Sequence, residues 1–210
     1  MPNSSAAFAA LARRTGVIPV VTIDRVADAV PLTRALLAGG LPIVEVTLRT
    51  EAALDAIRII AAECPEAHVG AGTVLTPTQG QSAVAAGAKF IVSPGSTDAL
   101  VEASKDWGVP YLPGVATPSE AMKLAEKGLT FLKLFPAEAV GGINLLKSLA
   151  APLPDIKFCP TGGLDAHKAQ MYLTLPNVVC VGGAWMTPAA AMKAADWAGI
   201  TTLAKACAPA

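Results

Sequence analysis

Short runs of β-branched and other apolar residues alternate along the chain with longer alanine-rich stretches. There are eight such runs, and their starts are 20 to 26 residues apart, the length of one strand–helix unit with short loops. Because each run is continuously apolar, it is typical of a strand in a parallel sheet whose outer face is covered by helices. The runs are VIPVVTI (17–23), IVEVTL (43–48), HVGAGTV (68–74), FIVSPG (90–95), YLPGV (111–115), FLKLFP (131–136), KFCPTG (157–162) and VVCVGG (178–183).

The stretches between these runs carry helix signals. RVADAVPLTRALLAGG (25–40) ends in glycine, and EAALDAIRIIAAE (51–63) spaces its apolar residues three to four apart. TPSEAMKLAEKG (117–128) opens with Thr, Pro and Glu in the positions of an N-cap and a first turn. Residues 3–14 predict an additional leading helix. Eight alternating units therefore predict an α/β fold, a (β/α)₈ TIM barrel with an extra N-terminal helix, formed by residues 1–210 as a single domain.

An open, doubly wound sheet is the alternative architecture. Such a sheet usually has fewer strands, and a dinucleotide-binding version would carry GxGxxG after an early strand. Neither GAGTVL nor GGLDAH has that spacing. The strand count and the missing fingerprint both favour the barrel.

Composition and charge exclude several classes of function. The chain is 53% hydrophobic and 15% charged, with 16 basic and 16 acidic residues, which predicts neither a nucleic-acid surface nor a polybasic membrane patch. No apolar window is long enough for a membrane-spanning helix, and the four cysteines form no CxxC pair. We therefore expect a cytoplasmic protein with reduced thiols and with no nucleic-acid or membrane partner. The two histidines, His68 and His167, fall in different strand–helix units, so we expect no metal site.

Charged residues occur at positions where a barrel strand should face inward. Alternate residues of such a strand point into the barrel, which assigns Glu45 and Arg49 to the inner face of the second run and Lys133 to that of the sixth. A buried Lys–Glu ion pair that only completes the core is the alternative, but such pairs are often no more stabilising than apolar residues of similar volume. Three charged groups near the C-terminal mouth favour a reaction site.

Lys133 predicts a specific chemistry. Apolar neighbours and a nearby guanidinium disfavour the ammonium form of a lysine. A neutral amine attacks ketones to form a Schiff base, and the protonated imine is an electron sink that makes an adjacent carbon–carbon bond breakable. Glu45 is the carboxylate expected to share this interior, so it is the candidate proton shuttle.

Paired glycines follow the last two predicted strands, in TGGLD (161–165) and GGAW (182–185). Glycine lets backbone N–H groups approach an oxyanion, and the loops after strands 7 and 8 are where barrels often bind phosphate. Thr161 can add a hydroxyl donor.

A smaller anion site is predicted after the third strand. Gly72 and Thr73, with Arg49 beside them, could hold a carboxylate. A tight turn with an N-cap threonine is the alternative for this segment.

Motifs along nearly the whole chain resemble those of the 2-keto-3-deoxy-6-phosphogluconate (KDPG) aldolases: PVVTI, GGLPIVEVTLRT, VGAGTVL, VSPG, LPGVAT, KLFPAE, FCPTGG and CVGGAW. The resemblance implies a metal-independent class I aldolase without a cofactor, which cleaves KDPG to pyruvate and glyceraldehyde 3-phosphate and forms a homotrimer. The same chemistry on 2-keto-4-hydroxyglutarate (KHG) or on the 6-phosphogalactonate epimer is an alternative. A non-catalytic protein that binds a phosphorylated sugar acid is an alternative of another class.

The resemblance also implies individual roles. Lys133 would form the Schiff base, Glu45 would be the general acid and base, and Arg49 and Thr73 would hold the pyruvyl carboxylate. The other residues expected at the substrate are Gly72, Pro94, Phe135, Thr161, Gly162, Gly163, Gly182, Gly183 and Ala184. Two departures from the family pattern are present. Ala184 stands where the family often has serine in GGSW, which removes one hydroxyl donor to the phosphate, and Ala116 replaces a common serine.

Overall fold

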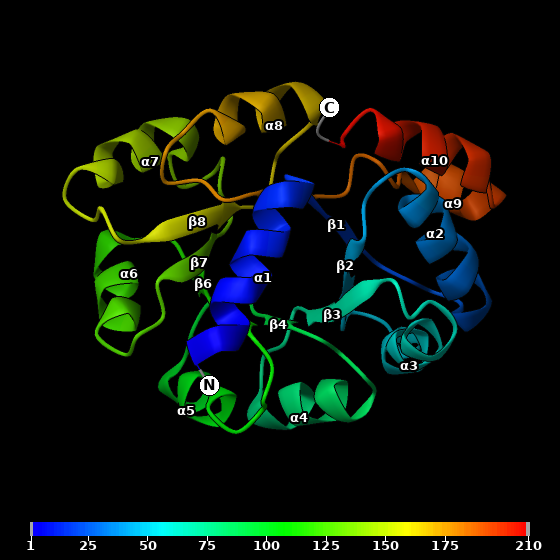
Figure 1. Ribbon diagram of the computed structural model, residues 1–210, viewed down its shortest axis with the longest axis horizontal. Coiled ribbons are helices and arrows are strands. Elements are labelled where there is room, and N and C mark those ends of the chain that lie inside the picture. The colour runs from blue at the N-terminus through cyan, green and yellow to red at the C-terminus, as the bar shows by residue number, and fades with distance from the viewer. Residues whose placement is uncertain (1, 209–210) are drawn as a thin grey trace.

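The computed structural model describes residues 2–208 and has parallel strands in a curled sheet with helices around it (Figure 1). The strands are β1 (Val17–Val21), β2 (Ile43–Thr47), β3 (His68–Gly72), β4 (Ile91–Val92), β5 (Tyr111–Leu112), β6 (Gly114–Val115), β7 (Phe131–Leu134), β8 (Lys157–Pro160) and β9 (Val181–Gly183). The helices are α1 (Pro2–Thr15), α2 (Val26–Ala38), α3 (Ala53–Glu63), α4 (Pro77–Ala85), α5 (Asp98–Ser104), α6 (Pro118–Ala125), α7 (Gly142–Ala150), α8 (Ala166–Leu173), α9 (Ala189–Ala194) and α10 (Trp197–Lys205).

The strands pair in parallel in two groups. One sheet has the order β5-β4-β3-β2-β1-β9 and the other the order β6-β7-β8. Parallel bridges between Phe158 and Val178 and between Thr161 and Gly182 link β8 to the segment that contains β9. The run predicted as a single strand over 111–115 is divided into β5 and β6 by Pro113, which has no N–H to donate to a ladder.

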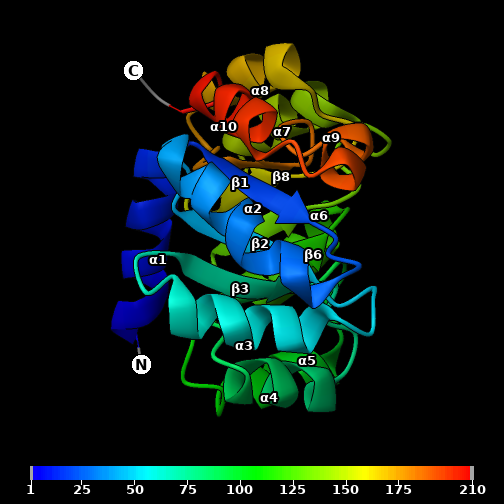
Figure 2. The ribbon, with the colours of Figure 1, turned by 90° about the vertical axis from the view of Figure 1, so that its right-hand side faces the viewer.

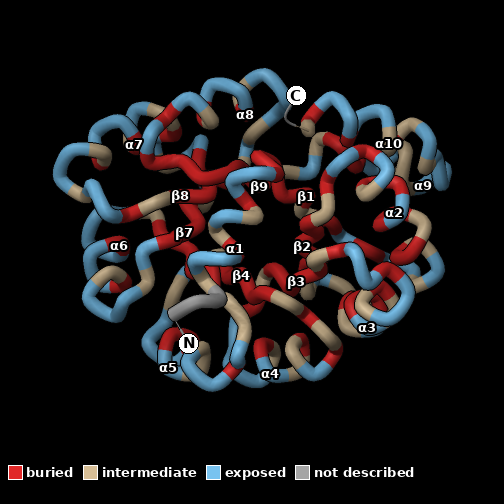
Figure 3. The backbone as a smooth tube through the Cα atoms, viewed as in Figure 1, coloured by how far each residue is buried: buried red, intermediate tan, exposed pale blue. Residues whose placement is uncertain are grey.

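Two hydrophobic clusters show how the strands alternate. Leu132 and Leu134 of β7 belong to the large cluster between the sheet and the helices, whereas Phe131 belongs to a smaller cluster. Figure 3 shows the same arrangement: buried residues follow the strands, and the outer turns of the helices are exposed. The side chains at Phe131 and Lys133 therefore share the inner face of β7, as the two-residue period predicts.

Helix α1 covers one end of the sheet. Figure 2 shows α1 at the end opposite to the tip of the β1 arrow, which is the N-terminal end of the strands. Phe8 of α1 is buried, and its ring stacks on those of Phe90, at 4.6 Å between centroids, and His68, at 5.7 Å. The leading helix predicted over residues 3–14 is confirmed. Two helices, α9 and α10, follow β9 where one was predicted.

The position of His68 makes stability depend on pH. Its Nε2 is buried without a hydrogen-bond partner among the described residues, and burial, with a smaller contribution from Lys89, lowers the pKa of the imidazole below its ordinary 6.5. Below that value the unfolded chain takes up a proton more readily than the folded one, so the free energy of unfolding should fall as the pH decreases. Urea unfolding on either side of pH ~6.5 measures this. His68→Phe should flatten the pH dependence of the free energy of unfolding, and His167→Gln, the control at an exposed site, should preserve it. A wild-type protein whose free energy of unfolding does not change over this pH range would contradict this assignment.

Candidate active site

Lys133 of β7 and Glu45 of β2 meet inside the curled sheet. Lys133 Nζ lies 3.1 Å from Glu45 Oε1, and the two residues are 5% and 3% exposed. They are the buried charged residues among the described side chains. Strands β2 and β7 are far apart in the sequence, and they bring a carboxyl and an amine into hydrogen-bond contact away from bulk water.

The backbone around the pair explains why it can form. Lys133 N donates to Pro113 O at 2.9 Å, and Lys133 is in register with Gly114 of β6. On the other side of the pair, a Cβ at Gly72 would lie 2.2 Å from Glu45 Oε1. Gly72 was expected at an anion, but the structure shows that its missing side chain makes room for the Glu45 carboxylate.

This pair can store and transfer a proton. In a low-dielectric interior the two opposite charges stabilise each other, and the Phe135 ring, whose centroid is 5.4 Å from Lys133 Nζ, adds a cation–π contact. The carboxylate contact places a proton acceptor beside the amine, and a neutral amine is the form that adds to a ketone. The geometry therefore suits imine chemistry.

Arg49 and Thr73 form a polar contact at the rim rather than inside. Arg49 Nε donates to Thr73 Oγ1 at 3.2 Å. We expected Arg49 to continue the inner face of β2, but β2 ends at Thr47 and Arg49 is exposed in the following turn. Thr73 has a φ of 57°, which is uncommon and unfavourable for a β-branched residue. The remaining guanidinium N–H groups of Arg49 are able to bind a carboxylate.

Pro94 lies beside the same strands. A Cβ at Gly114 would be 2.2 Å from Pro94 O, so Pro94 is against the residue that is in register with Lys133. A buried contact that the sequence did not reveal holds this loop: Ser93 Oγ and Tyr111 OH are 2.6 Å apart, and burial raises the pKa of Tyr111 to about 12. The loop at Pro94 is therefore fixed by a neutral phenol.

A cavity of about 1070 Å³ has Phe135, whose ring contacts Lys133 Nζ, in its lining. The residues that line it do not include Glu45, Gly72, Thr73, Pro94 or Lys133, which are also expected at the substrate. Of the residues predicted at the substrate, it is lined by Arg49, Phe135, Thr161, Gly162, Gly163, Gly183 and Ala184. Gly182 is outside this set; a Cβ there would lie 2.3 Å from Thr161 Oγ1, so its role is to let β9 approach Thr161. Lining residues that sequence reasoning missed include Asp24, Arg25, Trp185 and Lys193.

Trp185 supports the second glycine pair. A Cβ at Gly183 would be 1.9 Å from the Trp185 ring, and Trp185 Nε1 donates to Cys207 Sγ at 3.0 Å. The C-terminal end of the chain therefore anchors the loop that contains Ala184. The GGAW motif was noted for its glycines, and its tryptophan was the available signal for this contact.

A sequence profile described as KDPG and KHG aldolase matches residues 9–203 of the chain. The chain belongs to this aldolase family. A 2-dehydro-3-deoxy-phosphogluconate aldolase of Pseudoalteromonas atlantica is 50% identical over 189 residues, which is 90% of this chain and 88% of the relative.

Solved structures of the aldolase family have the same fold. KDPG aldolase of Legionella pneumophila, solved with pyruvate captured as a covalent carbinolamine, is 45% identical with a TM-score of 0.93, covering 96% of this chain and 98% of that one. The aldolase of Zymomonas mobilis, solved with 3-phosphoglycerate, is 44% identical with a TM-score of 0.92, covering 97% and 96%. The family match and the structural similarity therefore agree on the fold and on the carbon–carbon lyase class of this family member.

Within residues 2–208, no group of three or more His, Cys, Asp or Glu side chains could hold a metal ion. No helix in the same part of the chain is long and apolar enough to cross a bilayer.

Proposed function

We propose that this family member is a class I aldolase that cleaves KDPG to pyruvate and glyceraldehyde 3-phosphate. The observation that carries the proposal is the buried Lys133–Glu45 contact at 3.1 Å, which supplies a nucleophilic amine and a proton acceptor in one site. The covalent pyruvate adduct of the Legionella relative supports the same chemistry.

The proposed reaction uses both groups in turn. Lys133 Nζ adds to the C2 ketone to give a carbinolamine, which loses water to give the protonated imine. Glu45 removes the proton of the C4 hydroxyl, the C3–C4 bond breaks, and its electron pair moves into the imine to form an enamine while the aldehyde departs. Glu45 then returns a proton to C3, and hydrolysis of the imine releases pyruvate and the free amine.

The rest of the site is proposed to hold the two anionic ends of the substrate. Arg49 and Thr73 bind the carboxylate next to the reacting carbon, with Gly72 shaping the position of Glu45, and Pro94 and Phe135 flank the imine. The phosphate lies at the glycine loops. These contain Thr161, Gly162, Gly163, Gly182, Gly183 and Ala184. The 3-phosphoglycerate bound by the Zymomonas relative is a phosphorylated ligand of the required kind.

We further propose that residues 1–210 form one (β/α)₈ barrel domain, in which β5 and β6 act as a single strand and the bridges between β8 and β9 close the ring. The helices placed around the curled strands in Figure 1 support this closure. A homotrimer in the cytoplasm, acting on a phosphorylated keto acid without a cofactor, completes the proposal by analogy with the family.

Comparison of two substrates tests the phosphate assignment. We expect kcat/KM to be higher for KDPG than for the unphosphorylated KHG, with Ala184→Ser increasing kcat/KM for KDPG by about tenfold, because a hydrogen bond to a charged group contributes about 1.5–3 kcal/mol. KHG cleavage by the variant should stay unchanged. Equal kcat/KM values for both substrates in the wild-type enzyme would contradict the assignment.

A further inference from the structure

Outside the catalytic pair, the structure contains a second ionic cluster, built on Glu138. This residue follows β7 in the loop that leaves the Lys133 strand. Its Oε1 accepts from Tyr172 OH at 2.5 Å, and its Oε2 accepts from Lys168 Nζ at 2.6 Å. Tyr172 is fully buried in α8, while the side chains of Glu138 and Lys168 are 33% and 40% exposed. Both partners lower the pKa of Glu138, with Lys168 contributing most, so the carboxyl is ionised.

The cluster is hydrogen-bonded to the 161–164 loop, which contains the first glycine pair. Glu138 N donates to Gly162 O at 3.2 Å, and Lys168 Nζ donates to Gly163 O at 3.2 Å. Ala137 N donates to Thr161 O at 2.8 Å, which extends the same attachment by one residue. Carbonyls of three successive loop residues are thus held from the side of the β7–α7 connection.

Holding these carbonyls sets the direction of the opposite N–H groups. In a planar trans peptide the C=O and the N–H point in opposite directions, and the cis bond among the described residues is at Phe135–Pro136. The N–H groups of Gly163 and Leu164 therefore point away from the Glu138 cluster. Neither donates a hydrogen bond within residues 2–208, and both residues line the cavity. Two backbone donors without an acceptor, in residues that line a cavity, are suited to an oxyanion.

The packing leaves the carboxylate little freedom. Gly163 has a φ of 80°, and a Cβ there would lie 2.8 Å from Glu138 Cγ. A Cβ at Gly142 would be 2.7 Å from Tyr172 OH and 3.0 Å from Glu138 Oε1. The glycines on both sides of Glu138 therefore permit this contact, in the same way that Gly72 permits the position of Glu45.

We propose that Glu138 is a positioning residue for the phosphate end of the site, holding the 162–164 loop through Lys168 and Tyr172 so that the Gly163 and Leu164 N–H groups face the phosphate. This inference rests on the proposed function. It also explains the need for Lys168: an ionised carboxylate near a phosphate would repel it unless an ammonium group compensates the charge. The KLFPAE motif thus carries the Schiff-base lysine at one end and the loop-positioning carboxylate at the other.

Steady-state kinetics of Glu138→Gln, Lys168→Met and the double variant test the proposal. We expect Glu138→Gln to raise KM for KDPG by about tenfold, as for loss of one charge-assisted contact, and Lys168→Met to raise it further because it leaves an uncompensated carboxylate. The KM of the double variant should be close to that of Glu138→Gln and well below the value expected if the two single increases multiplied. Three other readouts should stay within about twofold of the wild-type values: kcat for KDPG, kcat and KM for KHG, and borohydride trapping of pyruvate. A general loss of structure would change all of them.

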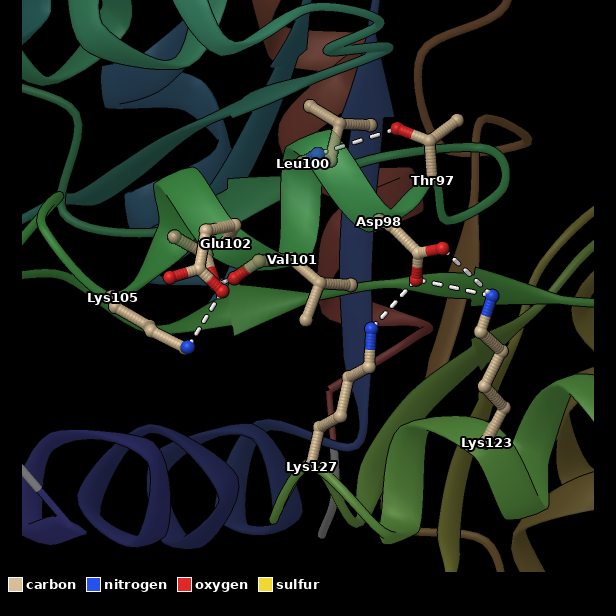
Figure 4. Close-up of polar contacts among 9 residues, drawn as sticks. Thr97, Asp98, Leu100, Val101, Glu102, Lys105, Lys123 and Lys127 are labelled. Carbon is tan, nitrogen blue, oxygen red and sulfur yellow. Dashed lines mark hydrogen bonds and ion pairs between the residues drawn. The ribbon is translucent and has the colours of Figure 1, made fainter.

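Asp98→Asn is the matched control. Like Glu138, Asp98 of α5 accepts hydrogen bonds from two side chains, in this case Lys123 at 3.0 Å and Lys127 at 2.6 Å (Figure 4). Helix α5 lies across the molecule from α8 (Figure 1). This variant should have unchanged kcat and KM for both KDPG and KHG. If Glu138→Gln does not fold, Tyr172→Phe, which removes one donor and keeps the ring, should give a smaller rise in KM for KDPG alone.

Equal losses with KDPG and KHG, or an unchanged KM for KDPG in a folded variant, would overturn the role of Glu138. A wild-type enzyme with no preference for KDPG is a different result, because it counts against the proposed function itself.

Discussion

Replacing Lys133 by alanine should eliminate pyruvate trapping and reduce kcat/KM for KDPG cleavage by about 10⁴-fold or more, since removal of a covalent nucleophile costs most of the rate enhancement. Lys133 is the buried lysine among the described side chains, so no other amine inside the sheet can take its place. The measurement is borohydride reduction with pyruvate, followed by intact mass and peptide mapping. The wild-type enzyme should carry one stable adduct, on Lys133.

Lys157→Ala is the control for this experiment. Lys157 begins the neighbouring strand β8, and its Nζ donates to Pro154 O at 3.1 Å at the exposed end of the strand. Removing it should leave trapping and turnover unchanged. A wild-type enzyme that remains unmodified, or an adduct on another lysine, would exclude Lys133 chemistry and favour a protein that only binds a sugar acid phosphate.

Stability has to be measured beside activity. Without Lys133 the Glu45 carboxylate is buried with no partner, and breaking such a pair typically costs about 3–5 kcal/mol. Combining Lys133→Met with Glu45→Gln removes both charges and should recover part of that loss. If urea unfolding shows the double variant folded and still unable to trap pyruvate, unfolding is excluded as the cause.

The inner positions of the catalytic pair could be predicted because a strand has a strict two-residue period. That argument succeeds for Glu45 and Lys133, which lie within β2 and β7, and it fails for Arg49, which lies beyond the end of β2. The two-residue alternation of side chains no longer applies once the chain has left the hydrogen-bonded strand. The break at Pro113 is a related case, in which a single missing N–H divides a continuous apolar run.

Contacts made by loops and glycines were beyond the reach of sequence patterns. The position of Gly72 is understood only when the Glu45 carboxylate is seen to occupy the space of its missing Cβ. Glu138 stands in a motif that was recognised for its lysine, yet its partners Lys168 and Tyr172 come from a helix that follows another strand. Spacing along the chain carries no signal for such a three-residue contact, because the contact depends on how α8 packs against the loop that follows β7.

Glu45→Gln should retain imine formation with pyruvate better than KDPG cleavage, which should slow by about 10²–10⁴-fold, the usual contribution of a general acid or base. The amide keeps the volume of the carboxyl and can still accept a hydrogen bond from Lys133 Nζ, so the amine stays in position. It cannot take the C4 hydroxyl proton or return a proton to C3.

Two readouts separate these steps for Glu45→Gln. Borohydride trapping with pyruvate reports the imine, and exchange of the pyruvate methyl protons in heavy water reports enamine formation, which should fall together with cleavage. Gly72→Ala tests the Glu45 carboxyl without changing Glu45 or Lys133. A Cβ at position 72 would lie 2.2 Å from Glu45 Oε1 and must displace the carboxyl, so the variant should have slower proton exchange and slower cleavage. Normal turnover in Glu45→Gln would show that another group moves the proton, and the buried pair would then be structural. Slow exchange with intact trapping instead assigns the proton transfer to Glu45, because imine formation and carbon–carbon cleavage differ in the need for a base at C3 and C4.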